Sequence, residues 1–197
     1  MTQKAVAEKM KSVSEKPLEF YPKEPDLRVP GEWALEIGPG KGEFLLWLAQ
    51  EQPRKNFVAL EIKKRRFLKI SKKIETLGLK NVTIARGDAR LCLLNLVPHG
   101  LLAEAFVLFP DPWPKRRHHK HRLLNLERTE ELHRLLKPGG AVWVATDDPH
   151  YAGQIRSVFP QERWSYKPGR SLYPTYFETK WKNLGREIHY FYFGKPK

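Results

Sequence analysis

The sequence predicts an α/β fold with a mostly parallel sheet of about seven strands flanked by helices. Short, nearly continuous apolar runs alternate along the chain with longer helical patterns, as in proteins built from successive βαβ units. The chain has 197 residues, of which 41% are hydrophobic and 12% aromatic, so it can bury a substantial interior. This length fits one domain, and the composition excludes wholesale disorder.

Seven segments have the length and texture of strands. The first five are nearly continuous apolar runs, as expected of parallel strands that are buried on both faces. They cover residues 33–37, 57–62, 82–85, 105–109 and 141–145. A short strand near Trp164 and an aromatic strand over residues 188–193 complete the predicted sheet.

Helical patterns fill the intervals between these strands. They cover residues 43–50, 63–77, 90–96, 123–136 and about 150–158. The fourth pattern stops at Lys137-Pro138-Gly139-Gly140, because proline and glycine end helices. Residues 167–187 form a long polar segment for which the sequence predicts no regular element.

The N-terminal segment differs in texture from the rest of the chain. It is basic, and the prolines at positions 17, 22, 25 and 30 exclude a continuous helix or a central strand. We therefore expect residues 1–28 to form a weakly ordered arm and residues 29–197 to form the folded domain.

The net charge predicts a polyanionic partner. The chain has 36 Lys and Arg against 22 Asp and Glu, a formal net charge of +14, and cations release counterions when they bind phosphates. Nucleic acid is the default partner and an anionic membrane surface is the rival. No apolar run approaches the roughly 20 residues that cross a bilayer, and no secretory signal begins the chain. The single cysteine, Cys92, fits a reducing compartment, so we expect a cytoplasmic protein.

A glycine-rich loop follows the first predicted strand. It reads Gly38-Pro39-Gly40-Lys41-Gly42 and leads into a helix. Glycines let a backbone turn sharply and approach a ligand, and doubly wound sheets bind ligands at this end of their strands. The spacing is not the Gly-x-Gly-x-x-Gly of dinucleotide-binding proteins. For the glycines alone, a plain strand-to-helix turn is the alternative.

An acidic residue two positions before these glycines completes a more specific pattern. Glu36 followed by Gly-x-Gly-x-Gly resembles motif I of the class I methyltransferases that use S-adenosylmethionine, whose sulfonium amino acid is cationic. The resemblance implies a Rossmann-like fold with an antiparallel last strand. It also implies that Glu36, Gly38, Gly40 and Gly42 bind the methyl donor.

Two further carboxylates lie where this resemblance predicts donor contacts. Glu61 ends the second strand, a position from which an acid accepts hydrogen bonds from ribose hydroxyls. Asp88 follows the third strand and is placed to face the adenine edge. For each residue alone, an ordinary solvated or helix-capping carboxylate is the alternative.

The fourth strand ends in Pro110-Asp111-Pro112-Trp113-Pro114-Lys115, followed by a tract of Arg, His and Lys. This run resembles the signature of the bacterial tRNA (guanine-N7-)-methyltransferase family. Thr146-Asp147 and Thr175-Tyr176-Phe177-Glu178 resemble two further motifs of that family. The resemblance covers about residues 30–193, and Pro39 within the glycine loop is its small departure.

The family resemblance implies transfer of a methyl group from S-adenosylmethionine to N7 of a guanine in the tRNA variable loop, which gives 7-methylguanosine. Asp111, at the carboxyl end of the fourth predicted strand, is our candidate for the catalytic residue and for a contact with the methyl donor. Substrate and RNA contacts are implied for Lys115, Arg116, Arg117, His118, His119, Lys120, Asp147, Thr175, Phe177 and Glu178.

The chemistry of N7 needs no strong base, because its in-plane lone pair carries no proton. Alignment of N7, methyl carbon and sulfur is then the main catalytic effect, and a carboxylate stabilises the charge that develops on the ring. Asp111 is our choice for that carboxylate, although it can equally orient the base through its N1–H and amino group. Trp113 is either a stacking platform or a core residue.

Several patterns remain open to two interpretations. The seven cations within residues 63–73 either bind RNA or form a solvated helix face, although cations are disfavoured at a helix N-terminus. The histidines near residue 120 lack accompanying thiol or carboxylate ligands, so we expect no metal. Methylation of a protein or a free amine, and RNA binding without catalysis, are the competing functions. The sequence predicts no oligomeric state.

Overall fold

The computed structural model describes residues 18–197, so residues 1–17 of the arm predicted over residues 1–28 lie outside the described range. One sheet forms the centre of the molecule, with strand order β1-β4-β3-β2-β5-β6-β8-β7. The strands are β1 (Glu19–Tyr21), β2 (Trp33–Ile37), β3 (Asn56–Glu61), β4 (Val82–Arg86), β5 (Leu102–Leu108), β6 (Leu136–Thr146), β7 (Ser165–Pro168) and β8 (His189–Gly194).

The strand directions confirm a mostly parallel sheet. Strands β4, β3, β2, β5 and β6 are parallel to one another, while β8 runs antiparallel to β6, as predicted for the last strand. The short β7 pairs antiparallel with β8, and β1 pairs antiparallel with β4. Within residues 18–197 the sheet therefore has eight strands rather than about seven.

Strand β1 is a strand that the sequence did not predict. It lies within the segment that we assigned to the arm, and Pro22 follows it directly. Proline is tolerated at the edge of a sheet, where an N–H is not needed for pairing, and β1 occupies such an edge.

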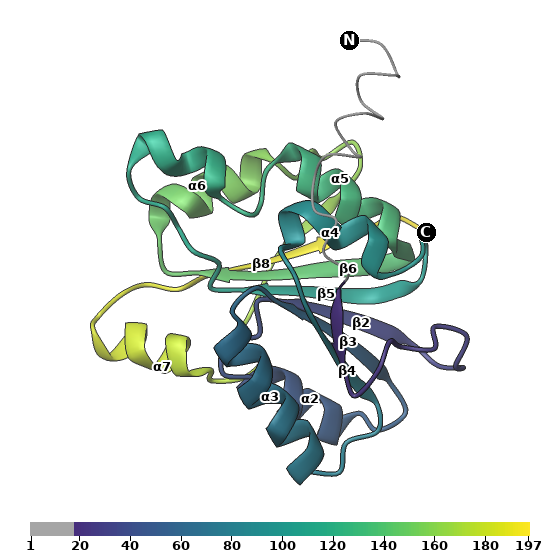
Figure 1. Ribbon diagram of the computed structural model, residues 1–197. Helices are drawn as coiled ribbons and strands as arrows, with labels where there is room; N and C mark the ends of the chain where they lie inside the picture. The colour runs from purple at the N-terminus through teal and green to yellow at the C-terminus, as the bar shows by residue number, and fades with distance from the viewer. Residues whose placement is uncertain (1–17) are drawn as a thin grey trace.

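Helices cover both faces of the sheet, as Figure 1 shows. Helices α2 and α3 lie on one face, and α4, α5 and α6 lie on the other. Their bounds are α2 (Glu43–Glu51), α3 (Lys64–Thr76), α4 (Ala89–Leu96), α5 (Leu126–Leu135) and α6 (Pro149–Ser157). Among the described residues, no helix is long and apolar enough to cross a membrane.

Two elements occur where no helix was predicted. Helix α7 (Tyr176–Asn183) interrupts the polar segment 167–187, with the Thr175 hydroxyl accepting the N–H of Glu178 at its N-terminus. The 3₁₀ helix η1 (Arg116–His121) orders the basic tract after β5. Both segments lack a strong apolar period, so tertiary contacts rather than pattern determine them.

Strand β6 is longer than predicted at its N-terminal end. Helix α5 ends at Leu135, before the Lys-Pro-Gly-Gly stop, but the strand already begins at Leu136. Its pairing with β5 shifts register beside Gly140, where an added Cβ would lie 3.0 Å from the carbonyl oxygen of Ala103. Glycine therefore permits an irregular strand where the sequence pattern indicated a loop.

The glycine loop between β2 and α2 depends on left-handed backbone conformations. Gly38, Gly40 and Gly42 have φ angles of 73°, 61° and 76°, which residues with a side chain rarely adopt. Gly42 is the N-cap of α2, and a Cβ there would lie 3.0 Å from Ile70 Cγ1 on α3. Conformation and packing together require glycine at this position.

We expect Gly42→Ala to destabilise the fold more than Gly100→Ala. Gly100 also has a positive φ, of 72°, but no atom lies within 4 Å of the point that a Cβ would occupy. The control should lose about 1 to 2 kcal/mol from backbone strain, and Gly42→Ala about 1 to 3 kcal/mol more from the contact with Ile70. Urea unfolding of both variants measures the difference, and equal losses would contradict the packing argument.

Candidate active site

The candidate site lies at the edge where the parallel strands end. Gly38 directly follows β2, and its N–H donates to the carbonyl oxygen of Leu60 at 2.9 Å, which joins the glycine loop to the end of β3. Parallel strands present their carboxyl ends at one edge, so residues that follow β2, β3, β4, β5 and β6 gather there.

Two buried carboxylates form the floor of this edge. Glu36 on β2 and Glu61 on β3 are 4% and 1% exposed. Glu61 Oε1 accepts the N–H of Lys63 at 2.8 Å, but Glu36 Oε2 and Glu61 Oε2 have no hydrogen-bond partner among the described residues. Burial, together with the charge of Glu61, raises the pKa of Glu36 to about 8. A buried polar group without a partner is costly, so these oxygens suit a ligand that brings its own donors.

S-adenosylmethionine, the methyl donor implied by the sequence, fits these residues. Ribose hydroxyls and a cationic amino acid supply the hydrogen-bond donors and positive charge that the buried oxygens lack. The glycine loop allows such a ligand to approach the backbone closely.

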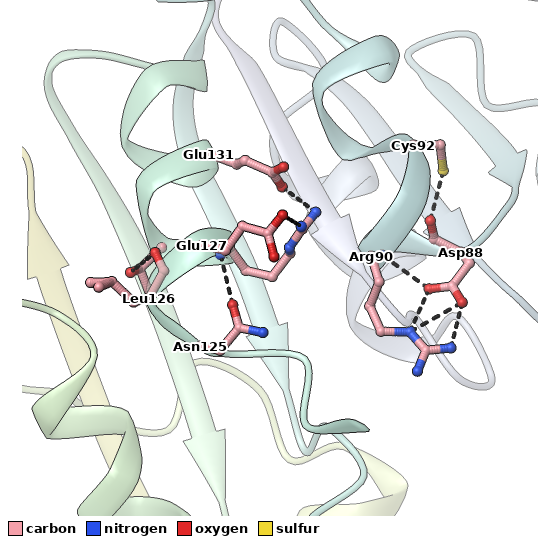
Figure 2. A network of polar contacts seen from close by, with 9 residues as sticks. Asp88, Arg90, Cys92, Asn125, Leu126, Glu127 and Glu131 are labelled. Atoms are coloured by element: carbon pink, nitrogen blue, oxygen red, sulfur yellow. Dashed lines mark hydrogen bonds and ion pairs between the residues drawn. The ribbon is translucent and has the colours of Figure 1, made fainter. Parts of the chain in front are cut away.

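Asp88 adopts the helix-capping role that was the alternative for it. Its Oδ1 accepts the N–H of Arg90 at 3.0 Å at the N-terminus of α4. The Arg90 guanidinium folds back onto the same carboxylate, as Figure 2 shows, with an Nη2 to Oδ2 distance of 2.5 Å. These hydrogen bonds from Arg90 lower the pKa of Asp88 against the opposing effect of burial. Contact with adenine remains a prediction for this residue.

The loop after β5 has a strained backbone. Phe109 and Trp113 have φ angles of 54° and 45°, which are uncommon for residues with bulky side chains. Between them lies Asp111, which is exposed to solvent. Trp113 is 37% exposed and packs against His118 and His121, with ring centroids 5.8 and 5.2 Å away. The interpretation of Trp113 as a core residue is therefore wrong.

Arg122 is a buried side chain that donates a hydrogen bond to the backbone of this loop. It ends the basic tract after Lys115, but it is 2% exposed and so is not part of the exposed surface of that tract. Its Nε donates to the carbonyl oxygen of Pro112 at 2.7 Å, and its Nη1 donates to Gln154 Oε1 at 2.6 Å. The guanidinium lies 4.7 Å from the centre of the Tyr151 ring. Arg122 thus joins the loop to α6.

The rest of the tract is more accessible. Lys115, Arg116, Arg117 and Lys120 are exposed, whereas His118 and His119 are half-buried. Within residues 18–197, no group of three or more His, Cys, Asp or Glu side chains is arranged to hold a metal ion. The exposed cations form a rim beside Asp111.

Asp147, which follows β6, forms an ion pair with Arg186, a residue that the sequence did not indicate. Its Oδ2 receives a hydrogen bond of 2.5 Å from Arg186 Nη1. The sequence gives no signal for this pair, because 39 residues separate its members and Arg186 lies in an irregular segment.

The predicted substrate motif at residues 175–178 docks α7 onto the glycine loop. Thr175 caps the helix, and buried Glu178 pairs with Lys182 at 2.6 Å. The Phe177 ring covers Gly40, so that a Cβ on Gly40 would lie 3.7 Å from Phe177 Cε2. Gly40 and Phe177 both line a pocket that Glu36 and Phe109 also line.

Two contacts that the sequence did not predict strengthen this docking. The N–H of Tyr176 donates to Glu43 Oε2 at 2.8 Å, across 133 residues of sequence. Lys41 Nζ lies 3.2 Å from the centre of the Tyr176 ring. The N-terminus of α7 and the glycine loop therefore form one surface.

Comparisons with known proteins agree with this fold and site. Residues 31–191 match a protein family described as putative methyltransferases, which defines the class of the chain. The chain is 34% identical over 158 residues to the tRNA (guanine-N(7)-)-methyltransferase of Thermotoga maritima, a match covering 78% of this chain and 50% of that protein. It is 38% identical over 161 residues to the protein of that name from Nitrosospira multiformis, covering 78% and 70%. The chain belongs to the tRNA (guanine-N(7)-)-methyltransferase family.

The chain is shorter than one of these relatives, and its fold resembles that of a solved methyltransferase. The chain spans half the length of the Thermotoga maritima relative. Among solved structures, the 16S rRNA methyltransferase KamB superposes with a TM-score of 0.63 at 18% identity, covering 93% of this chain and 97% of that one. At this identity the likeness shows the fold alone.

The buried Glu36 predicts a distinctive dependence of stability on pH. Below the ordinary glutamate pKa of 4.5 the carboxyl is protonated in both the folded and unfolded states. Between that value and about 8 only the unfolded chain releases the proton, so the free energy of unfolding falls as pH rises. Above about 8 both states are ionised and the effect levels off.

We therefore expect Glu36→Gln to become more stable than the wild type as pH rises from 5 to 9. The relative gain should reach at most about 1.4 kcal/mol per pH unit. Urea unfolding across this range measures it, with Glu162→Gln as a control because Glu162 is exposed. Parallel pH profiles for the wild type and Glu36→Gln would refute a raised pKa for Glu36.

Proposed function

We propose that this chain transfers a methyl group from S-adenosylmethionine to N7 of a guanine in the variable loop of tRNA. The observation that carries the proposal is the juxtaposition of two buried carboxylates with unpartnered oxygens and a strained loop that presents Asp111 beside a basic rim. The relatives named tRNA (guanine-N(7)-)-methyltransferase support the same activity.

The donor would be bound at the ends of β2, β3 and β4. The glycine loop receives its amino acid part, Glu36 neutralises its positive charge, and Glu61 accepts hydrogen bonds from the ribose hydroxyls. Asp88 lies beside the adenine. When bound, S-adenosylmethionine supplies an electrophilic methyl group.

The guanine would be held between the loop after β5 and the residues that follow β6. Trp113, exposed on that loop, offers a ring for stacking. Lys115, Asp147 and the segment 175–178 contact the target nucleotide, and the η1 cations bind neighbouring phosphates. The base must be unstacked to enter this site, which suits a nucleotide in a loop.

Asp111 acts by charge and orientation rather than by removing a proton. N7 attacks through its own lone pair, so no base is required. The product ring is cationic, and a carboxylate fixed nearby stabilises the charge as it develops. Asp111 also contacts the donor in this arrangement, because β5 adjoins β2 in the sheet.

The remaining assignments follow from the tRNA substrate. Residues 29–197 are the methyltransferase domain, and residues 1–28 are an arm whose β1 segment anchors it to β4. The partner is tRNA, no metal is required for this chemistry, and the cytoplasm is the compartment in which the substrate is found.

Incubation with radiolabelled S-adenosylmethionine and unmodified tRNA, followed by nucleoside analysis, tests the activity. We expect label in 7-methylguanosine from the variable loop. Labelling of proteins or amines without RNA would support the competing enzyme function. Binding of tRNA without donor affinity would support a non-catalytic RNA-binding protein. Donor binding without 7-methylguanosine formation would refute the proposal.

We expect Asp111→Ala to lower kcat at least 100-fold while changing tRNA affinity less than twofold. The carboxylate contributes to the transition state, whereas phosphate contacts dominate RNA affinity. Asp111→Asn separates its two roles, because an amide keeps one acceptor oxygen but no charge. Single-turnover rates at saturating tRNA measure both variants, and nearly unchanged turnover would assign the step to another group.

We expect Arg122→Lys to lower kcat about 10-fold or more with unchanged donor affinity. A lysine lacks the planar fork with which the guanidinium donates from two separate nitrogens to Pro112 and Gln154, so the loop that carries Asp111 becomes less ordered. Arg117→Lys is the matched control, since Arg117 is exposed on the same tract. A higher KM with normal kcat would instead mark Arg122 as an RNA contact.

A further inference from the structure

The outward surface of α3 carries cations that the candidate active site does not use. The helix packs onto the sheet through Phe67, Ile70 and Ile74, which are all buried. Its other side is exposed and carries Lys64, Arg65, Lys69, Lys72 and Lys73. We call these five residues the α3 basic face.

The α3 basic face lacks acidic partners among residues 18–197. None of its members takes part in an ion pair there. Lys73 Nζ donates to the carbonyl oxygen of Lys41 at 2.9 Å, which ties the far end of the face to the glycine loop. The charge of the face is therefore not neutralised by the surrounding protein.

This arrangement does not serve the stability of the helix. The first turn of α3 contains no acidic residue, although the positive end of the helix dipole favours one. Arg65, Lys69 and Lys73 are spaced four residues apart, a spacing at which like charges repel. Because this distribution of cations opposes helix formation, the stability of the helix does not explain it, and a function in binding does.

The position of the face connects it to the candidate active site. Helix α3 begins at Lys64, three residues after Glu61, whose carboxylate accepts the N–H of Lys63. Strand β2 lies between β3, which leads into α3, and β5, which leads into the Asp111 loop and η1. The α3 basic face and the exposed cations of η1 therefore flank the site from opposite sides.

We propose that the α3 basic face binds the phosphate backbone of the tRNA, outside the loop that carries the target guanine. The inference rests on the proposed function. The cations of this face are exposed and unpaired, and they lie at the edge where the substrate base must enter. They can therefore bind phosphates of a polyanion that extends beyond the site. An RNA is favoured over an anionic lipid surface because the face adjoins the site of the guanine.

The test compares two triple variants that lose the same charge. In the first, Arg65→Gln, Lys69→Gln and Lys72→Gln neutralise the α3 basic face. In the control, Arg54→Gln, Lys80→Gln and Arg134→Gln remove exposed cations that precede β3, β4 and β6, at the opposite edge of the sheet. Affinity for unmodified tRNA is measured by fluorescence anisotropy over a series of salt concentrations.

We expect the α3 variant to bind tRNA at least 10-fold more weakly than the wild type at about 0.1 M salt. The slope of log affinity against log salt should fall in magnitude by about 2, at about 0.7 to 0.9 for each phosphate that is no longer bound. The control variant should remain within twofold. Affinity for S-adenosylhomocysteine should not change in either, and thermal unfolding verifies that both are folded.

The outcomes separate this inference from the proposed activity. Equal tRNA affinities and salt slopes for the two triple variants overturn the inference, even where the wild type forms 7-methylguanosine. A wild type that binds tRNA without forming 7-methylguanosine refutes the activity, and the affinity comparison still decides the role of α3. Loss of binding to phosphatidylserine vesicles by the α3 variant, with normal tRNA affinity, overturns the inference in favour of a lipid surface.

Discussion

The burial of Glu36 and Glu61 is the constraint on which the arrangement of the site depends. On each side chain the Oε2 atom has no hydrogen-bond partner among the described residues, inside a sheet whose neighbouring positions are mostly apolar. The fold tolerates this desolvation, which raises the pKa of Glu36, because the hydrophobic clusters on both faces of the sheet stabilise the strands that carry these acids. A ligand with positive charge and hydroxyl groups relieves the cost, so the same burial that weakens the free protein strengthens binding.

Most of the sheet and the five helices α2 to α6 follow from the sequence because hydrophobic periodicity is a local signal. The parallel strands are nearly continuous apolar runs, and α3 shows its buried positions at helical spacing. The missed elements have no such signal. Strand β1 has three half-buried residues and exists through pairing with β4, while α7 is fixed by contacts of Tyr176 with Glu43 and Lys41. Long-range contacts of this kind are not encoded in a local pattern.

For the site, too, the sequence predicts the types of residue present but not the environment of each side chain. Motifs indicate which residues gather at the strand ends, because parallel strands bring their carboxyl ends together. They do not indicate which side chains are buried or already paired. Arg122 and Arg117 belong to one basic tract, yet only Arg122 lies beneath the loop. Asp88 and Glu61 occupy equivalent strand ends, yet Asp88 is paired with Arg90 while Glu61 keeps an unpartnered oxygen.

The acidic and the basic residues of the site differ in burial: the acids are buried and the cations are exposed. The acids at the ends of β2 and β3 are buried, where low dielectric strengthens their interaction with a cationic group. The cations of η1 and α3 are exposed, where water and salt weaken each contact and many must act together. Tight recognition of a small donor and reversible binding of a large polyanion require these opposite environments. One sheet edge supplies both, because strands end in the interior while the helices and loops that follow them reach the surface.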